Sequence, residues 1–371
     1  MSQKKPKIAF FGSSLVSSYW NGAATYYRGI IKYLYRLGYQ VTFYEPDAFD
    51  RQKHVDLPNP EFARSVVYEN HPDSVEMAVR EALGADILIK ASGVGVMDAF
   101  LERTLLEIKR PHHLVIFWDV DAPATLDSVF KNEQAPFREL IPRYDSIFTY
   151  GGGQPVIDAY HSLGAKECIP VYNALDPETH YPVAPLPQYL CDLAFLGNRL
   201  PDREERVVEF FIRVARLMPE KSFILGGSGW DDVDLPSNIR YVGHVYTNDH
   251  NAFNSSARVV LNISRQSMAN YGFSPATRVF EAAGAGACLI TDYWEGIENF
   301  FSSPEEIRIA GDGMQVAEIL ETMTVDKAKE TGQKALNRVL SDHTYNLRAL
   351  QVSNIFMRKE SFMEDERKPG R

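Results

Sequence analysis

Two residues whose types and spacing favour chemistry, Arg278 and Glu281, stand three positions apart in the segment 271–299. Residues at this spacing share one face of a helix, and the plain interpretation of such a pair is a surface salt bridge. The alternative is a ligand-binding pair, because ligands bind in the crevice at the ends of parallel strands. The setting favours this alternative, since a short predicted helix leads directly into a buried strand.

The elements that must position this pair can be predicted locally. Ser274 is a good N-cap and Pro275 a good first helical residue, so a helix is expected to begin there. The small residues 284–286 are expected to end it. An apolar run at 287–291 then predicts a buried strand that ends at Asp292.

Length and composition indicate a globular protein of two domains. The chain has 371 residues, 45% of them hydrophobic and 24% charged. A formal net charge of -10 argues against a nucleic-acid polymer as partner, because phosphate contacts need a basic surface. A small anionic ligand needs only a few local donors and is not excluded.

Three scattered cysteines, Cys168, Cys191 and Cys288, fit neither a disulfide framework nor a zinc site, which predicts a reducing compartment. The apolar run near the N-terminus is too short for a signal peptide, and no apolar segment approaches 18 residues. These features predict a cytoplasmic protein without a membrane span.

The pattern of the first half of the chain predicts a doubly wound α/β domain. Its opening unit is a strand at 7–11, a loop containing Asn21 and Gly22, a helix and a strand at 40–44. The loop lacks the G-x-G-x-x-G spacing of a dinucleotide site. Asn21 and Gly22 are expected either to reach the phosphates of one ligand or a second, acceptor ligand, or to form a plain helix-entry turn.

A second α/β series follows a proline-rich stretch. The predicted organisation is an N-terminal domain at 1–172, a linker at 173–189, a C-terminal domain at 190–344, and a terminal helix with a charged tail at 345–371. Strands are predicted at the following positions: 7–11, 40–44, 87–90, 114–118, 146–150, 167–171, 192–196, 222–225, 239–242, 257–263 and 287–291. Helices are predicted around 26–37, 74–83, 101–108, 136–140, 203–217, 316–323, 327–340 and 345–356.

Several short motifs in residues 190–300 resemble the group 1-like glycosyltransferases of GT-B fold, and within them the CgeB spore-maturation proteins. The matching motifs are FLGN at 195–198, YVGH at 241–244, LNI at 261–263, RVFEA at 278–282 and LIT at 289–291. The resemblance implies two Rossmann-like doubly wound domains facing across a cleft. The C-terminal domain would bind a nucleotide-sugar, with a UDP-sugar as the expected donor and no cofactor, and the N-terminal domain would bind the acceptor.

The resemblance also assigns roles to residues. Glu281 would accept hydrogen bonds from the two ribose hydroxyls, and Arg278, with the helix start at Ser274, would hold the diphosphate. Arg199 is a second candidate for the diphosphate, and His244 is either a base contact or an ordinary loop histidine. The remaining donor-binding candidates are Gly197, Asn198, Gly243 and Tyr271.

One departure concerns the mechanism. Many relatives carry a second glutamate about eight residues before the first, and Phe273 stands at that position here. A retaining mechanism of the kind that those relatives use is therefore in doubt.

Asp119 and Asp121, at a predicted strand end, are the candidates for the general base that transfer with inversion requires. The alternative is that they cap the turn before Pro123. Together they also spell D-x-D, which holds a metal in GT-A enzymes, but two Rossmann-like halves argue against that fold. We therefore expect no metal site and no metal requirement.

The predicted activity is transfer of a hexosyl or pentosyl group to an unidentified acceptor, which can be a glycan, a protein or a small molecule. Two alternatives remain open at this stage. One is a nucleotide-sugar epimerase of the same fold, and the other is a non-catalytic nucleotide- or sugar-binding protein.

Overall fold

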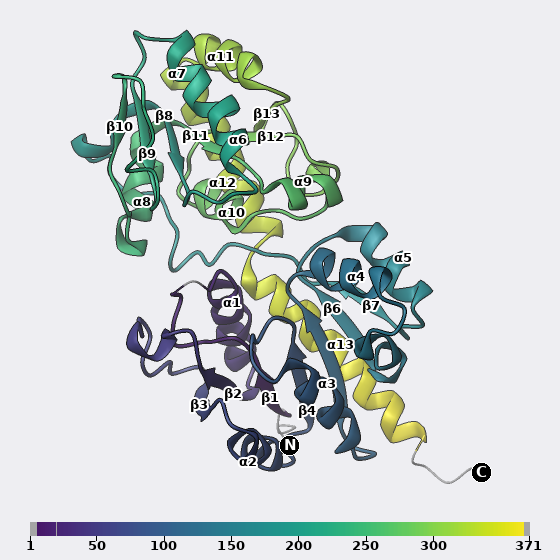
Figure 1. Ribbon diagram of the computed structural model, residues 1–371. Helices are drawn as coiled ribbons and strands as arrows, with labels where there is room; N and C mark the ends of the chain where they lie inside the picture. Colours follow the sequence, from purple (N-terminus) through teal and green to yellow (C-terminus); the bar gives the residue numbers. More distant parts are fainter. Residues whose placement is uncertain (1–5, 20, 367–371) are drawn as a thin grey trace. The chain divides into compact units, whose positions relative to one another are not determined.

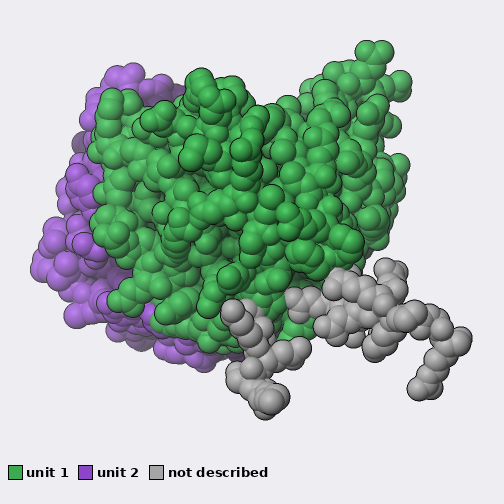
Figure 2. Space-filling view, turned by 90° about the horizontal axis from the view of Figure 1, so that it is seen from below, with its two compact units in different colours: residues 1–172, 345–371 green, residues 173–344 purple. Residues whose placement is uncertain are grey.

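The computed structural model describes residues 6–19 and 21–366, with side chains described up to residue 359. The chain forms two compact units, coloured separately in Figure 2. Unit 1 comprises Met1–Tyr172 and Tyr345–Arg371, and unit 2 comprises Asn173–Thr344. The predicted linker therefore packs as part of unit 2, and the C-terminal helix as part of unit 1.

Unit 1 contains seven parallel strands connected by helices (Figure 1). Its strands are β1 (Lys7–Phe11), β2 (Gln40–Asp47), β3 (Arg64–Glu69), β4 (Ile87–Ala91), β5 (Leu114–Asp119), β6 (Ser146–Thr149) and β7 (Cys168–Pro170). Its helices are α1 (Ala23–Arg36), α2 (Pro72–Ala82), α3 (Asp98–Glu107), α4 (Ala122–Lys131), α5 (Gly153–Ser162) and α13 (Tyr345–Glu366).

The sheet of unit 1 has the order β3-β2-β1-β4-β5-β6-β7. Strand order reverses between β1 and β4, and in open α/β sheets ligands bind at such a switch point. Every residue of β4 and β5 is buried, as expected for parallel strands covered on both faces. The long helix α13 packs against α1, where Gly29 lies on the ring of Tyr345 and leaves no space for a Cβ atom.

Unit 2 contains six parallel strands in the order β10-β9-β8-β11-β12-β13, with the reversal between β8 and β11. Its strands are β8 (Cys191–Leu196), β9 (Phe223–Gly226), β10 (Ile239–Tyr241), β11 (Ala257–Asn262), β12 (Leu289–Asp292) and β13 (Arg308–Ala310). Its helices are α6 (Glu204–Val207), the π-helical turn η5 (Val208–Ile212), α7 (Arg213–Leu217), α8 (Thr247–Ser256), α9 (Gln266–Tyr271), α10 (Thr277–Gly284), α11 (Gly313–Thr322) and α12 (Val325–Asp342).

The prediction of two doubly wound α/β domains is confirmed, whereas several elements differ from their predictions. The helix predicted at 203–217 is continuous but contains the π-helical turn η5, the one predicted around 136–140 is the 3-10 turn Pro136–Glu139, and α13 extends ten residues beyond Phe356, to Glu366. Elements that the sequence did not predict are β3, β13, α4, α5, α8 and α9.

The predicted linker is fixed on α8 by its backbone. The N–H of Val183 donates to Ser255 Oγ at 3.2 Å, and that of Leu186 donates to Ser256 Oγ at 2.8 Å. These bonds satisfy backbone N–H groups of residues 181–186, which lie in no strand or helix of their own. The serines of α8 therefore serve the packing of the linker, which explains why this helix lacks the usual apolar periodicity.

Candidate functional site

The centre of the candidate site is Glu281 on α10, a residue that is only 8% exposed. Its Oε2 lies 3.7 Å from Arg278 Nη1, and its Oε1 lies 3.9 Å from His180 Nε2. Among the described residues, no group donates a hydrogen bond to either carboxylate oxygen. The predicted Arg278–Glu281 pair therefore exists, but as a loose and partly buried contact rather than a surface salt bridge.

Charges around Glu281 keep it ionised despite burial. Burial alone would raise the pKa of Glu281, but His180 and Arg278 outweigh this effect and hold the pKa below its ordinary value. The pKa of His250 is lowered to about 4, first by burial and then by the positive charge of Arg278. His250 is therefore neutral near pH 7, and Glu281 carries a negative charge.

Three nitrogens around Glu281 are buried without hydrogen-bond partners in the described part of the chain. They are Arg278 Nη1, His180 Nε2 and His250 Nδ1. The other ring nitrogen of His250, Nε2, lies 3.2 Å from the carbonyl oxygen of Val245. Buried polar atoms normally find partners, so a group of unpaired ones marks a place that can accept a ligand.

Arg203, which the sequence interpretation passed over, belongs to the same site. Its pKa is lowered to about 10, mainly by burial and next by repulsion from Arg278. Its Nε is buried and unpaired within the described structure, and its guanidinium lies 5.6 Å from the ring centre of Phe195. A visible signal was its position as the first residue of the helix predicted at 203–217, close after the strand-end turn at 197–199.

Arg199, the second residue predicted to bind the diphosphate, already forms ion pairs within the protein. Its Nη2 lies 2.6 Å from Glu204 Oε1, and its Nη1 lies 2.7 Å from Asp232 Oδ1. These two carboxylates raise the pKa of Arg199. The geometry therefore favours Arg203 over Arg199 as the partner of Arg278.

Loops after β8, β9 and β10 meet at the carboxyl edge of the sheet. Asn198 Oδ1 accepts a hydrogen bond from the N–H of Ser228 at 2.9 Å, and Gly227 N–H donates to the carbonyl of Gly243 at 2.7 Å. Gly227 has a φ of 118°, and a Cβ there would lie 2.2 Å from the oxygen of Gly197. The predicted residues Gly197, Asn198 and Gly243 are thus brought together.

The start of α10 differs from the prediction. The helix begins at Thr277, and Ala276 rather than Ser274 is the N-cap residue. Ser274 is buried, with 5% of its surface exposed, and no side chain caps the helix. Pro275 falls before the helix because the chain is still extended at Ala276. The first turn of α10 therefore keeps its backbone donors without a side-chain cap.

The other predicted donor residues lie at the surface. His244 is exposed and packs edge-on against Tyr246, with 4.7 Å between ring centres. Tyr271, the last residue of α9, is 37% exposed. Phe273 has a φ of 46°, and its N–H donates to the carbonyl of Glu295 at 2.6 Å.

Asp119 is fully buried at the end of β5, and its carboxylate has a full set of donors. Oδ1 accepts hydrogen bonds from Ser92 Oγ at 2.7 Å and Thr125 Oγ1 at 3.0 Å, and Oδ2 accepts one from Tyr160 at 2.5 Å. Burial raises the pKa of Asp119, and these donors oppose the rise. Its position favours a structural role over that of a base.

Asp121 is exposed and stands at the N-cap position of α4, although its side chain caps no N–H group. Asn21 is buried and holds its own loop, with Oδ1 accepting from Ser13 Oγ at 2.9 Å and Nδ2 donating to the carbonyl of Ser14 at 2.9 Å. Gly22 is exposed with open space around it. These contacts favour the helix-entry turn for Asn21.

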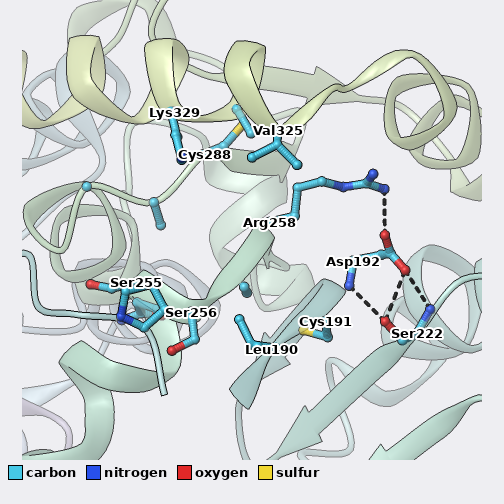
Figure 3. Close-up of a pocket in the computed structure, with 16 residues that line it drawn as sticks. Leu190, Cys191, Asp192, Ser222, Ser255, Ser256, Arg258, Cys288, Val325 and Lys329 are labelled. Carbon is cyan, nitrogen blue, oxygen red and sulfur yellow. Dashed lines mark hydrogen bonds and ion pairs between the residues drawn. The ribbon is translucent and has the colours of Figure 1, made fainter. Parts of the chain in front are cut away.

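A cavity of about 460 Å³ lies at the opposite, amino edge of the unit 2 sheet. Figure 3 shows Asp192 at its wall, bonded to Ser222 and facing Arg258. Cys191 and Ala257, the first residues of β8 and β11, line it. The lining of the cavity includes neither Glu281 nor Arg278, so the cavity is not the candidate site.

Comparison with protein families gives one match. Residues 203–354 match a family model described as glycosyl transferase-like. A comparison with curated proteins found no match. Within the described residues, no helix has the length and apolar character needed to cross a membrane.

Solved structures resemble the chain along almost its full length. Sucrose-phosphate synthase from Thermosynechococcus elongatus has a TM-score of 0.70 at 14% identity, over 96% of this chain and 100% of that one. HepE from Anabaena, in complex with UDP and glucose, has a TM-score of 0.68 at 15% identity, over 95% of this chain and 99% of that one. An α-glucosyltransferase in complex with UDP and a DNA 13-mer has a TM-score of 0.69 at 13% identity, over 95% of this chain and 100% of that one.

These likenesses define the fold as GT-B, and residues 203–354 as glycosyl transferase-like. They do not favour the epimerase alternative, and they do not single out the CgeB proteins. The DNA in one neighbour means that the fold alone does not exclude a nucleic-acid partner, so that prediction depends on the acidic charge of this chain.

Proposed function

We propose that the protein is a metal-independent glycosyltransferase that uses a UDP-sugar, transfers a hexosyl or pentosyl group, and acts in the cytoplasm. The observation that carries the proposal is the ionised carboxylate of Glu281 beside a buried N–H group of Arg278, both without a hydrogen-bond partner among the described residues. Family membership close to the CgeB proteins remains part of the proposal and depends on the motifs in residues 190–300.

The donor would bind through complementary groups. Two ribose hydroxyls would donate to Glu281, which accepts no hydrogen bond within the described part of the chain. The diphosphate would lie against Arg278 and Arg203, whose mutual repulsion it would relieve, and near the uncapped first turn of α10. The same positive groups would stabilise the negative charge that develops on the departing UDP.

The acceptor would bind to unit 1, with Asp121 as the candidate base. Asp121 is exposed, and its carboxylate has no hydrogen-bond or ion-pair partner among the described residues, whereas Asp119 is buried and fully bonded. The choice of a UDP-sugar is supported by HepE, which was solved with UDP-glucose.

Calorimetric titration of the full chain with UDP tests the donor site. Glu281→Gln should weaken UDP binding by about 10- to 150-fold, which corresponds to the loss of a hydrogen bond to a charged group. Glu318→Gln, on the exposed face of α11, is the matched control and should bind like the unmodified protein. Equal affinity in both variants would show that the nucleotide binds elsewhere.

Two further measurements extend this test. Arg278→Gln should weaken binding of UDP but leave binding of uridine unchanged, because uridine lacks the diphosphate. Release of UDP from a UDP-sugar, with and without candidate acceptors, separates an enzyme from a non-catalytic binder. Abolition of transfer by a chelator would overturn the metal-independent mechanism.

A further inference from the structure

Three metal-binding side chains converge within unit 2. His180, His250 and Glu281 each place one ligand atom so that the three atoms lie within 4.8 Å of one another. They come from the segment before β8, from α8 and from α10. His180 is 4% exposed and Glu281 is 8% exposed, so the group differs from an ordinary cluster of surface acids.

The hydrogen bonds of the group give independent evidence. His180 Nε2 and His250 Nδ1 are both buried without a partner among the described residues. His250 Nε2 lies 3.2 Å from the carbonyl of Val245. If this nitrogen carries the proton, the lone pair of His250 is on Nδ1, which is the arrangement that metal-binding histidines take from an outer partner.

We propose that His180, His250 and Glu281 form a binding site for Zn²⁺. Two imidazoles and one carboxylate are a recurrent donor set for zinc with an open fourth position. Imidazole nitrogens disfavour Mg²⁺ and Ca²⁺, which prefer oxygen ligands. Bonds of about 2.1 Å in a tetrahedral site separate ligand atoms by about 3.4 Å, so the 3.9 Å between His180 and Glu281 requires only a small contraction.

Arg278 limits the strength of this site. It lies 3.7 Å from Glu281 Oε2, on the carboxylate oxygen that does not face His180. Its positive charge repels a divalent cation while it attracts a diphosphate. The metal and the nucleotide therefore place opposite demands on one residue.

Zinc and the nucleotide also share Glu281, a consequence that rests on the proposed function. A carboxylate bound to zinc cannot also accept both ribose hydroxyls, so occupation by the metal excludes the donor. The site would thus inhibit a transferase whose chemistry needs no metal.

The test is titration of the metal-free full chain with Zn²⁺ by calorimetry, and with Co²⁺ as a visible-absorption probe of tetrahedral coordination. We expect one bound ion. His180→Ala and His250→Ala should each weaken binding by at least about 100-fold, the upper range for loss of an outer partner alone. His244→Ala, an exposed histidine of the same unit, is the control and should bind normally.

Arg278→Gln retains all three ligands and provides a second test. It should bind Zn²⁺ more tightly and UDP more weakly, whereas a variant that only misfolds would lose both and show a lower melting temperature. Saturating uridine, which lacks the metal-binding diphosphate of UDP, should suppress zinc binding to the unmodified protein. Zinc affinity left unchanged by His180→Ala and His250→Ala, or no bound ion, would overturn the site.

The two proposals fail in different ways. Zinc binding without UDP binding would refute the donor site alone, and UDP binding without zinc binding would refute the metal site alone. Simultaneous binding of both would refute their shared use of Glu281.

Discussion

At the scale of single residues, side chains that can bind a ligand differ from those already paired within the protein by their partners rather than by their chemical type. Arg199 and Arg278 carry the same guanidinium in the same unit. Arg199 is held by two carboxylates, whereas Arg278 has a buried nitrogen without a partner among the described residues. An anion that binds Arg199 must replace the two carboxylates, whereas one that binds Arg278 meets a nitrogen without a partner among the described residues. Binding of an anion at Arg278 therefore costs less free energy.

Asp119 and Asp121 should respond differently to removal of their charge. Asp119→Asn would place amide hydrogens against the donors Ser92, Thr125 and Tyr160, and should lower the free energy of unfolding by about 1–3 kcal/mol. Asp121→Asn should leave stability unchanged, because Asp121 is exposed. Urea unfolding checks both variants, and equal stability of the two would contradict the structural role of Asp119.

At the scale of elements, the loop after β1 is held by two carboxylates, of which Glu45 is buried and Asp56 is exposed. Glu45, at 0% exposure on β2, accepts hydrogen bonds from Ser14 Oγ and from the N–H of Leu15. Both oxygens of Glu45 are therefore used inside the protein. Asp56 holds the next part of this loop through Ser18 and Arg28.

Asp56 should make stability depend on pH. Burial raises its pKa, but hydrogen bonds from Arg28 and Ser18 outweigh this and lower the pKa from 3.8 to about 2. A lowered folded-state pKa stabilises the protein above the unfolded value, and this contribution is lost as the pH falls towards 2. Asp56→Asn should cost about 1 kcal/mol at pH 7, a value reduced for the partial exposure of the pair.

Urea unfolding at several pH values measures this effect. The difference between the unmodified protein and Asp56→Asn should shrink steadily between about pH 4 and pH 2. A difference that stayed constant over that interval would show that the carboxylate is not ionised in this contact.

The close contact between the loops after β8 and β9 depends on Gly227, which lies against Gly197. Gly227→Ala should lower the free energy of unfolding by at least about 1–3 kcal/mol, because its φ is 118° and the added Cβ would meet Gly197. Gly22→Ala is the matched control, since Gly22 has a helical φ of -61° and open space. A gain of about 0.4–1 kcal/mol is expected there, and urea unfolding measures both.

At the scale of the whole molecule, each compact unit has its own core and its own buried thiol. Cys168 lies in the core of unit 1, and Cys288 lies in the core of unit 2. Burial raises the pKa of both thiols to about 12. Since the thiolate is the reactive form, both should react slowly with alkylating reagents until their unit opens.

UDP should therefore protect the two thiols unequally. A ligand present at 100 times its Kd stabilises the unit that binds it by about 2.7 kcal/mol, so labelling of Cys288 should slow by up to about 100-fold. Cys168 should be unaffected and serves as the internal control. Mass spectrometry of labelled peptides measures both rates, and equal protection would show that the units open together.

The sequence by itself determined the fold class and the position of the central helix. Buried strands such as β4 and β5 are mostly apolar, with one charged residue each, and the run 278–281 followed by small residues marked α10. Both signals are local, because a strand that is buried on both faces is rich in apolar residues. Polar α8 gave no such signal, since its serines bond to a distant segment.

Only the tertiary structure decided which polar residues are available. Asp119 is removed from solvent by Ser92 and Tyr160, which come from other elements. His180 precedes β8 in the chain, yet it lies beside Glu281. Hydrogen bonding and burial depend on contacts between segments far apart in the chain, so the types and spacing of nearby residues cannot reveal them.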